Sequence, residues 1–246
     1  MNCPRCGYNN PETANFCSRC GLQLIKSTGQ RRPVAVIFAD IAGFTQLAEK
    51  MDPEEVKDLI DQCLQRLALV IQKYEGFVDK FIGDCVMALF GAPVAHEDDP
   101  LRAVLAGLDL LKEISAFNHE KKQKLSLSIG INYGFVATGD LGRPGGYTVM
   151  GDAVNIAQRL QNAAPKGKIY VSEEIYKYTN REVIYRKLKK ISVKGKKELL
   201  AVYTPLRARL KYGQRKIKEI PLIGRVEEMN LLNKVFQEVK SGKGRI

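Results

Sequence analysis

The sequence has no apolar run that approaches the roughly 20 residues needed to cross a membrane as a helix. It also lacks a basic segment followed by an apolar one at its start, so we expect no secretory leader, a cytoplasmic location and no membrane partner. Histidine is scarce: the two residues, His96 and His119, are expected at the surface, in or beside a predicted helix. What is left is a globular protein of 246 residues, long enough for one full-sized core and a small additional unit.

Acidic residues are in the minority, and the formal net charge of +12 first suggests nucleic acid as a partner. The excess is local, because residues 181–219 hold 14 Lys or Arg and three Glu, while the rest of the chain is close to neutral. A basic strand and linker beside a polyphosphate site would give this distribution, and so would a solvated face. Basic residues alone do not make a nucleic-acid reader, so we do not favour such a partner.

Four of the six cysteines form two matched pairs, with two residues inside each pair and ten between the pairs: Cys3, Cys6, Cys17 and Cys20. Four thiolates at this spacing can reach one tetrahedral zinc ion, and Gly7 and Gly21 directly after the pairs allow tight turns. We predict a zinc ribbon with one structural Zn²⁺ and no open position for catalysis. What the ribbon binds is left open: a protein, a nucleic acid or nothing. Cys63 and Cys85 stand alone in apolar patterns and are interpreted as buried thiols.

The apolar pattern after the ribbon starts with a strand. Val34–Ala39 is a continuous apolar run, typical of a strand that is buried on both faces, and it is expected to end at Asp40. A helical pattern follows, with Asp52 as a plausible N-cap and Pro53 at the first helical position.

The next segments complete a known order of elements. Phe77–Phe81 and Cys85–Phe90 are predicted strands at hairpin spacing, a helix should then run to about Asn118, and Leu125–Tyr133 is another strand. This order predicts the α+β class with a ferredoxin-like βαββαβ arrangement, in which helices cover one face of a sheet. A further helix is predicted over Ala153–Ala164.

Two aspartates stand where this fold would place a site. Asp40 follows the first strand and precedes a predicted helix start, where backbone N–H groups attract phosphate and Gly43 permits close approach. Asp84 lies in the hairpin turn. If the first strand and the hairpin are neighbours, the two carboxylates converge and suit Mg²⁺ or Mn²⁺. An ordinary helix cap and an ordinary turn would look the same, so spacing alone leaves metal binding open.

Three segments closely resemble the class III adenylyl and guanylyl cyclase family, in the same order and spacing: Val36–Thr45, Lys80–Asp84 and Tyr147–Leu160. The resemblance implies an adenylate cyclase, a phosphorus–oxygen lyase that makes cyclic AMP and pyrophosphate from ATP by two-metal-ion catalysis. It also implies a cyclase catalytic domain at 34–206, which follows the zinc ribbon at 1–24 and a linker of polar, Gly and Pro residues at 25–33. The last segment, 207–246, is a basic linker and a helical tail that resembles, from Ile223, the lead-in to signal-transduction ATPase domains, so we expect the start of a truncated signalling module there.

The family's residue roles carry over to matching positions. Asp40 and Asp84 are implied to hold two Mg²⁺ or Mn²⁺ ions, with the carbonyl of Ile41 as a further ligand. Terminal phosphates are implied to contact Lys194 and the backbone of four residues, Ala42, Gly43, Phe44 and Thr45. Asn155 is implied to orient the ribose, and Arg159, four residues later on the same helix face, to stabilise the transition state.

The base-reading positions indicate adenine. Lys80 falls on the family's adenine-reading lysine, and Thr148 stands where many adenylyl cyclases have Asp. A hydroxyl can still accept a hydrogen bond from the adenine amino group. The Thr variant resembles a branch that includes bicarbonate-responsive soluble cyclases, whereas guanylyl cyclases typically carry Glu at the position of Lys80.

The family builds each site from two subunits, and this chain carries both sets of residues. The resemblance therefore implies a head-to-tail homodimer with shared active sites. The alternative is a non-catalytic regulatory module with the cyclase fold, which binds a partner protein through the ribbon. Retention of the metal, base and transition-state positions favours the enzyme.

Overall fold

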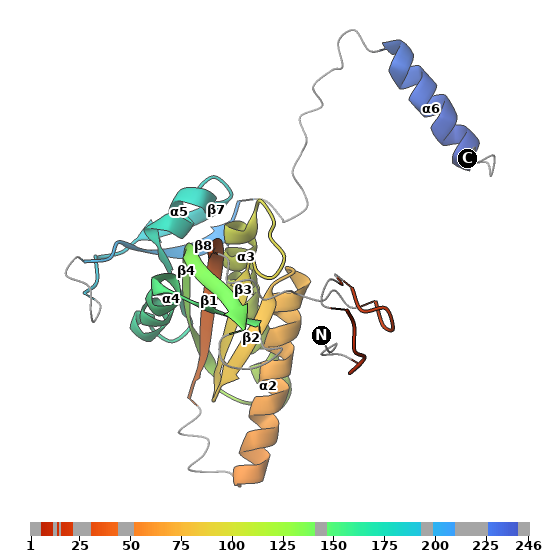
Figure 1. The fold of residues 1–246 in the computed structure, drawn as a ribbon. Helices are drawn as coiled ribbons and strands as arrows, with labels where there is room; N and C mark the ends of the chain where they lie inside the picture. The colour runs from red at the N-terminus through yellow and green to blue at the C-terminus, as the bar shows by residue number, and fades with distance from the viewer. Residues whose placement is uncertain are drawn as a thin grey trace. The chain divides into compact units, whose positions relative to one another are not determined.

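The computed structural model of the protein describes residues 6–11, 14, 16–21, 31–43, 52–140, 147–192, 199–209 and 226–240 (Figure 1). It divides into two compact units, residues 1–210 and residues 211–246. The second unit contains one described helix, α6 (Val226–Lys240). Four of the predicted site residues lie outside the described residues: Cys3, Phe44, Thr45 and Lys194.

The first unit is built on one sheet with helices on both of its faces. Its elements follow one another as β1 (Arg31–Ala42), α2 (Pro53–Lys73), β2 (Phe77–Ile82), β3 (Cys85–Phe90), α3 (Asp99–Lys121), β4 (Ser126–Asp140), β5 (Tyr147–Met150), α4 (Asp152–Ala163), β6 (Lys168–Ser172), α5 (Glu173–Thr179), β7 (Val183–Lys187) and β8 (Val202–Ala208).

The strand order is β2-β3-β1-β4-β6-β8-β7, with β5 paired to β4. β1 is central and runs antiparallel to both β3 and β4, while β4 and β6 are parallel. The first four strands with α2 and α3 form the predicted ferredoxin-like βαββαβ arrangement, which is therefore confirmed.

The alternation of β1 explains why both faces of the sheet are covered. Successive side chains of a strand point to opposite faces, and here both sets are apolar. One set packs in a core with α2 and α3: Ala35, Ile37, Ala39 and Ile41. The other set packs with α4: Val34, Val36 and Phe38. The prediction placed helices on one face, and α4 is the addition that covers the second.

β1 also continues further than its apolar pattern indicates. Asp40 remains in the ladder, paired with Cys85 of β3 and Ser128 of β4, and the strand ends only at Ala42. Asp40 is polar and ends the apolar run, but its backbone still takes part in the hydrogen bonds of the sheet. Asp40 follows Phe38 by two residues, so its side chain emerges on the face that carries α4.

The start of α2 follows its sequence signals. Asp52 caps the helix and accepts a hydrogen bond from the backbone N–H of Glu54 at 3.0 Å, with Pro53 at the first position. Its apolar stripe, which includes Leu67 and Ile71, is buried against the sheet. None of the helices in the described ranges combines the length and apolar character that a membrane crossing requires.

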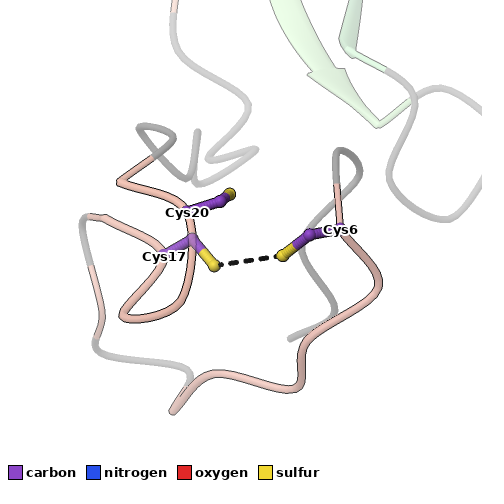
Figure 2. Close-up of side chains that lie close together, drawn as sticks. All are labelled: Cys6, Cys17 and Cys20. Carbon is purple, nitrogen blue, oxygen red and sulfur yellow. Dashed lines mark hydrogen bonds between the residues drawn. The ribbon is translucent and has the colours of Figure 1, made fainter.

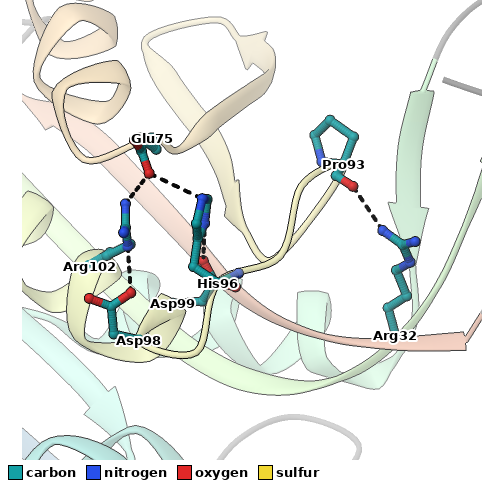
Figure 3. A network of polar contacts seen from close by, with 7 residues as sticks. All are labelled: Arg32, Glu75, Pro93, His96, Asp98, Asp99 and Arg102. Carbon is teal, nitrogen blue, oxygen red and sulfur yellow. Dashed lines mark hydrogen bonds and ion pairs between the residues drawn. The ribbon is translucent and has the colours of Figure 1, made fainter. Parts of the chain in front are cut away.

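A polar network joins the end of α2 to the start of α3 (Figure 3). His96 lies with Nε2 3.1 Å from Glu75 and Nδ1 3.3 Å from Asp99, and its backbone N–H donates to Asp99 at 2.7 Å. Arg102 pairs with Glu75 and with Asp98. His119 is exposed as expected, but His96 is half-buried in this network. The network follows β3, at the opposite end of that strand from Asp84, so we assign it to the fold.

Candidate active site

The two predicted acidic residues lie side by side at the end of β1. The backbone N–H of Ile41 donates to the carbonyl oxygen of Asp84 at 3.2 Å, which joins the hairpin turn to the strand that carries Asp40. Gly83 has a φ of 61°, a left-handed conformation that glycine adopts without strain, and this turn presents Asp84 beside β1. The convergence expected from the strand order is present.

The charges of this pair affect one another. Burial, and then the negative charge of Asp84, raise the pKa of the Asp40 carboxyl above its ordinary value. Burial raises the pKa of the neighbouring Cys85 thiol to about 12, and the charges of Asp40 and Asp84 add to the effect. Two half-buried carboxylates that repel one another fit a divalent cation, which would neutralise them with the oxygen ligands that Mg²⁺ and Mn²⁺ prefer.

The backbone beyond Asp40 turns at a glycine. Gly43 has a φ of 104°, and a Cβ atom there would lie 3.4 Å from the carbonyl oxygen of Lys124, so this position favours glycine. Ala42 and Gly43 are the part of the predicted phosphate loop that the structure describes.

A second cluster forms around Thr148 of β5. Lys80 of β2 donates from Nζ to Thr148 Oγ1 at 3.0 Å, so the two predicted base-reading residues are in direct contact. Asp79 joins them: its Oδ2 accepts from Thr148 at 3.0 Å and lies 3.1 Å from Lys80 Nζ. Sequence reasoning missed Asp79, since a strand residue next to Lys80 should point to the other face.

This cluster borders a pocket of about 270 Å³. Its lining comes from β2, β5 and the start of α4: Lys80, Thr148, Val149, Met150, Gly151, Val154 and Asn155. Asn155 is exposed at this edge, and Arg159 lies one turn further along α4. Neither Asp40 nor Asp84 lines this pocket, so the acidic pair lies outside the cavity at the base-reading cluster.

A hollow of about 700 Å³ lies elsewhere on the same unit. Residues of β4, α4 and β8 line it, among them Asn132, Ile156 and Tyr203. Among the residues that the structure describes, none of its lining residues is a predicted site residue. The volume of this hollow does not by itself indicate a function. We therefore place the candidate site at the acidic pair and the Thr148 cluster.

The described cysteines near the N-terminus form a cluster of their own (Figure 2). The sulfur atoms of Cys6, Cys17 and Cys20 all lie within 4.8 Å of one another, and Figure 2 shows Cys6 pointing toward Cys17 with Cys20 beside it. Burial opposes ionisation of Cys17, but backbone N–H groups of Cys20 and Arg19 and further hydrogen bonds outweigh it and lower its pKa to about 6. A stabilised thiolate in a sulfur cluster fits a zinc ligand.

Comparison with known proteins identifies the family of this chain. A sequence model of the adenylate and guanylate cyclase catalytic domain matches residues 27–204, and a zinc-ribbon model matches residues 2–24. The first match covers well over half of the chain. The chain therefore belongs to the family of adenylate and guanylate cyclase catalytic domains, with a zinc ribbon at its N-terminus.

Characterised relatives include an adenylate cyclase of Anabaena cylindrica, 30% identical over 187 residues, and adenylate cyclase 1 of Rhizobium meliloti, 29% identical over 181 residues. Each alignment covers 70% of this chain but only 36% and 27% of the relative, so the chain spans about a third of the length of these proteins.

Solved structures of similar fold include both types of cyclase. The adenylyl cyclase CyaB from P. aeruginosa superposes with a TM-score of 0.71 and 33% identity, over 73% of this chain and 96% of CyaB. The guanylyl cyclase Cya2 superposes with a TM-score of 0.69 and 30% identity, over 75% of this chain and 96% of Cya2. Overall similarity therefore defines a nucleotidyl cyclase fold, and the base preference has to come from side chains.

Proposed function

We propose that this protein is an adenylate cyclase that converts ATP to 3′,5′-cyclic AMP and pyrophosphate. The contact between Lys80 and Thr148 carries the choice of base. An ammonium can only donate and a hydroxyl can accept, and adenine offers an acceptor at N1 beside a donor at its amino group. Guanine presents the reverse pattern at these two positions. The relatives named above as adenylate cyclases support the same choice.

The acidic pair is the proposed metal site. Asp40, Asp84 and the carbonyl of Ile41 would hold two Mg²⁺ or Mn²⁺ ions, a role that the proximity and mutual repulsion of the carboxylates support. When bound, such ions lower the pKa of an attacking hydroxyl and neutralise the charge of a leaving polyphosphate.

The remaining residues bind and orient the nucleotide. Backbone N–H groups of Ala42, Gly43, Phe44 and Thr45 hold the terminal phosphates, which Lys194 also contacts, and Asn155 orients the ribose. The ribose 3′ oxygen forms a bond to the α-phosphorus, the bond from that phosphorus to the β-phosphate oxygen breaks, and the hydroxyl proton passes to solvent. Arg159 stabilises the charge that develops on the transferring phosphoryl oxygens.

The complete site is proposed to form between two copies of the chain. The acidic pair does not line the pocket at Lys80, Thr148 and Asn155, and a head-to-tail homodimer would bring the acidic pair of one copy to the pocket of the other. Exposed apolar side chains next to the pocket support this. Phe81 and Ile82 are each 48% exposed and Met150 is 61% exposed, and an interface would bury them.

The zinc ribbon is proposed as a structural unit with one Zn²⁺ held by four thiolates, those of Cys3, Cys6, Cys17 and Cys20. The cluster of the three described cysteines and the acidity of Cys17 support it.

A turnover assay tests the proposed activity. The purified chain is incubated with Mn²⁺ and either ATP or GTP, and cyclic nucleotide and pyrophosphate are measured by chromatography. We expect equal amounts of cyclic AMP and pyrophosphate, with a higher kcat/KM for ATP than for GTP. Asp84→Asn should remove turnover, while Asp58→Asn, at an exposed position of α2, should leave it unchanged. Absence of product with both nucleotides, or preference for GTP, would contradict the proposal.

A further inference from the structure

Asp79 reaches the base-reading cluster because β2 is irregular at this residue. The pairing of β2 with β3 shifts between Val78 and Lys80, so that Asp79 is one extra residue in the strand. In a regular strand Asp79 and Lys80 would point to opposite faces, but a bulge re-aims the chain locally. Both side chains consequently reach Thr148.

The carboxylate of Asp79 is costly for the fold. Its side chain is 0% exposed, and Oδ1 is buried without a hydrogen-bond partner among the described residues. Leaving a buried acceptor unsatisfied opposes folding, and buried carboxylates are uncommon without full pairing. All the described polar contacts of Asp79 go through Oδ2, to Thr148 and Lys80. Because Asp79 destabilises the fold in this way and lies beside the predicted substrate pocket, we expect it to have a role in the site.

The donors and acceptors of the cluster indicate the role of Asp79 in the site. A hydroxyl has one proton and two lone pairs, an ionised carboxylate only accepts, and an ammonium only donates. The 3.0 Å contact therefore commits the Thr148 proton to Asp79 Oδ2, and the contact with Lys80 uses one lone pair of the same hydroxyl. One lone pair is left, so toward a ligand Thr148 Oγ1 is an acceptor and cannot donate.

This fixed polarity discriminates between the purines. The amino group at C6 of adenine donates, whereas the carbonyl at C6 of guanine needs a donor. A threonine free to rotate could satisfy either group. A threonine whose proton is held by Asp79 satisfies adenine and leaves the guanine carbonyl facing another oxygen, and sites that leave polar groups unpaired reject the wrong substrate.

We propose that Asp79 is a positioning residue that fixes the Thr148 hydroxyl as an acceptor and so sets the preference for adenine over guanine. The inference rests on the proposed use of this pocket for the base. Asp79 acts through Thr148 and also steadies Lys80 by the 3.1 Å contact.

The test measures binding, so that it is independent of turnover. ATP and GTP analogues without the 3′ hydroxyl cannot cyclise, and 3′-deoxy-ATP and 3′-deoxy-GTP are titrated with Mn²⁺ into the full chain by calorimetry. The wild type should bind the adenine analogue more tightly. Asp79→Ala removes the acceptor, and we expect the adenine-to-guanine ratio of affinities to fall about tenfold. Asp79→Asn retains a carbonyl acceptor at this place and should keep most of the preference.

A double-mutant cycle tests whether Asp79 acts through the Thr148 hydroxyl. In the background of Thr148→Val, which has no hydroxyl to orient, Asp79→Ala should leave the affinity ratio unchanged. Asp109→Ala is the matched control, because Asp109 likewise accepts from a lysine and a hydroxyl, Lys73 and Tyr74, but on α3. It should not change the ratio. Thermal unfolding of each variant confirms that the protein compared is folded.

Three results would overturn the inference. These are equal affinities of the wild type for the two analogues, an unchanged ratio in Asp79→Ala, and an equal effect of Asp79→Ala with and without the Thr148 hydroxyl. Failure of the proposed function is a different result, the absence of cyclic AMP from ATP, and it is read from the turnover assay.

Discussion

Gly130 of β4 lies so close to α4 that a Cβ atom there would be 2.2 Å from the carbonyl oxygen of Ala157. The contact is with helix backbone, which cannot rotate away as a side chain can. Beside it, the buried Asn132 donates to the carbonyl oxygen of Ala153 at 2.9 Å. These two residues dock α4 on the sheet, and α4 carries both Asn155 and Arg159.

Gly130→Ala should therefore damage the protein through α4. We expect a loss of about 1–3 kcal/mol in the free energy of unfolding, as for other overpacked sites, together with a lower kcat. Gly107→Ala is the control, because its Cβ would meet only side-chain atoms, the nearest being the end of Ile131 at 3.1 Å and the end of Ile169 at 3.4 Å, and alanine is a better helix former. Chemical denaturation of both variants measures the difference. Equal losses in the two variants would contradict the docking role of Gly130.

Asp40→Asn should stabilise the metal-free protein while it removes activity. The folded-state pKa of Asp40 is raised, so the ionised carboxylate is disfavoured in the folded state and wild-type stability falls as the pH rises through that pKa. The asparagine amide of the variant is neutral at every pH, so the variant does not lose this stability. At pH 7, thermal unfolding in a chelator should give a higher Tm for the variant.

Added Mn²⁺ should reverse that order. A ligand at 100 times its Kd stabilises the folded state by about 2.7 kcal/mol, and we expect this for the wild type and not for Asp40→Asn. A similar Mn²⁺-dependent rise in both proteins would mean that Asp40 is not a ligand. Asp58→Asn, exposed on α2, should behave as the wild type.

Asp109 should contribute to stability at neutral pH and lose that contribution in acid. Burial opposes its ionisation, but hydrogen bonds from Lys112, Lys73 and Tyr74 outweigh burial and lower its pKa to about 2. A depressed pKa stabilises the folded state above the unfolded pKa near about 4, and the effect disappears as the pH falls toward 2. Asp109→Asn should thus cost about 1–2 kcal/mol at pH 7 and little at pH 2. An equal cost at both values would contradict the assignment.

The ribbon should hold one zinc ion per chain. Metal analysis of the purified protein should find one Zn²⁺, which Cys17→Ser loses because a hydroxyl is a poor substitute for a thiolate ligand. Cys63→Ser serves as the control, since burial raises the pKa of that α2 thiol to about 12 and it stands apart from the cluster. Retention of zinc in Cys17→Ser would contradict the site.

Side-chain periodicity was enough to predict the central βαββαβ order. The strand at Val34–Ala39 and the helix capped by Asp52 both follow from local patterns of burial and capping. The same continuous apolar run also required a cover for its second face, which α4 supplies through Ala153 and Ala157. The prediction assigned helices to one face, and it gave the helix at Ala153–Ala164 no position on the sheet.

Two features of the site depend on backbone pairing between strands and could not be predicted from the sequence. β1 runs on through Asp40, since its ladder with β3 and β4 does not depend on apolar side chains. The bulge at Asp79 is a shift in the pairing of β2 with β3, and the residue pattern of β2 alone did not predict it. The roles of Asp40, Asp84, Asn155 and Arg159 stay predictions, now with a geometry that can be tested.

Restoring activity by mixing two inactive variants tests the shared site most directly. Asp40→Ala lacks a metal ligand and Arg159→Ala lacks the charge-stabilising cation, which should cost about 10²–10³ in rate. When equal amounts are allowed to exchange subunits, half of the dimers contain one intact site, and activity should return to about a quarter of the wild-type value. A mixture of Asp40→Ala with Asp84→Ala, both on the acidic side, should stay inactive. If isolated mixed dimers of Asp40→Ala and Arg159→Ala show no cyclic AMP synthesis, the two-protomer site is wrong.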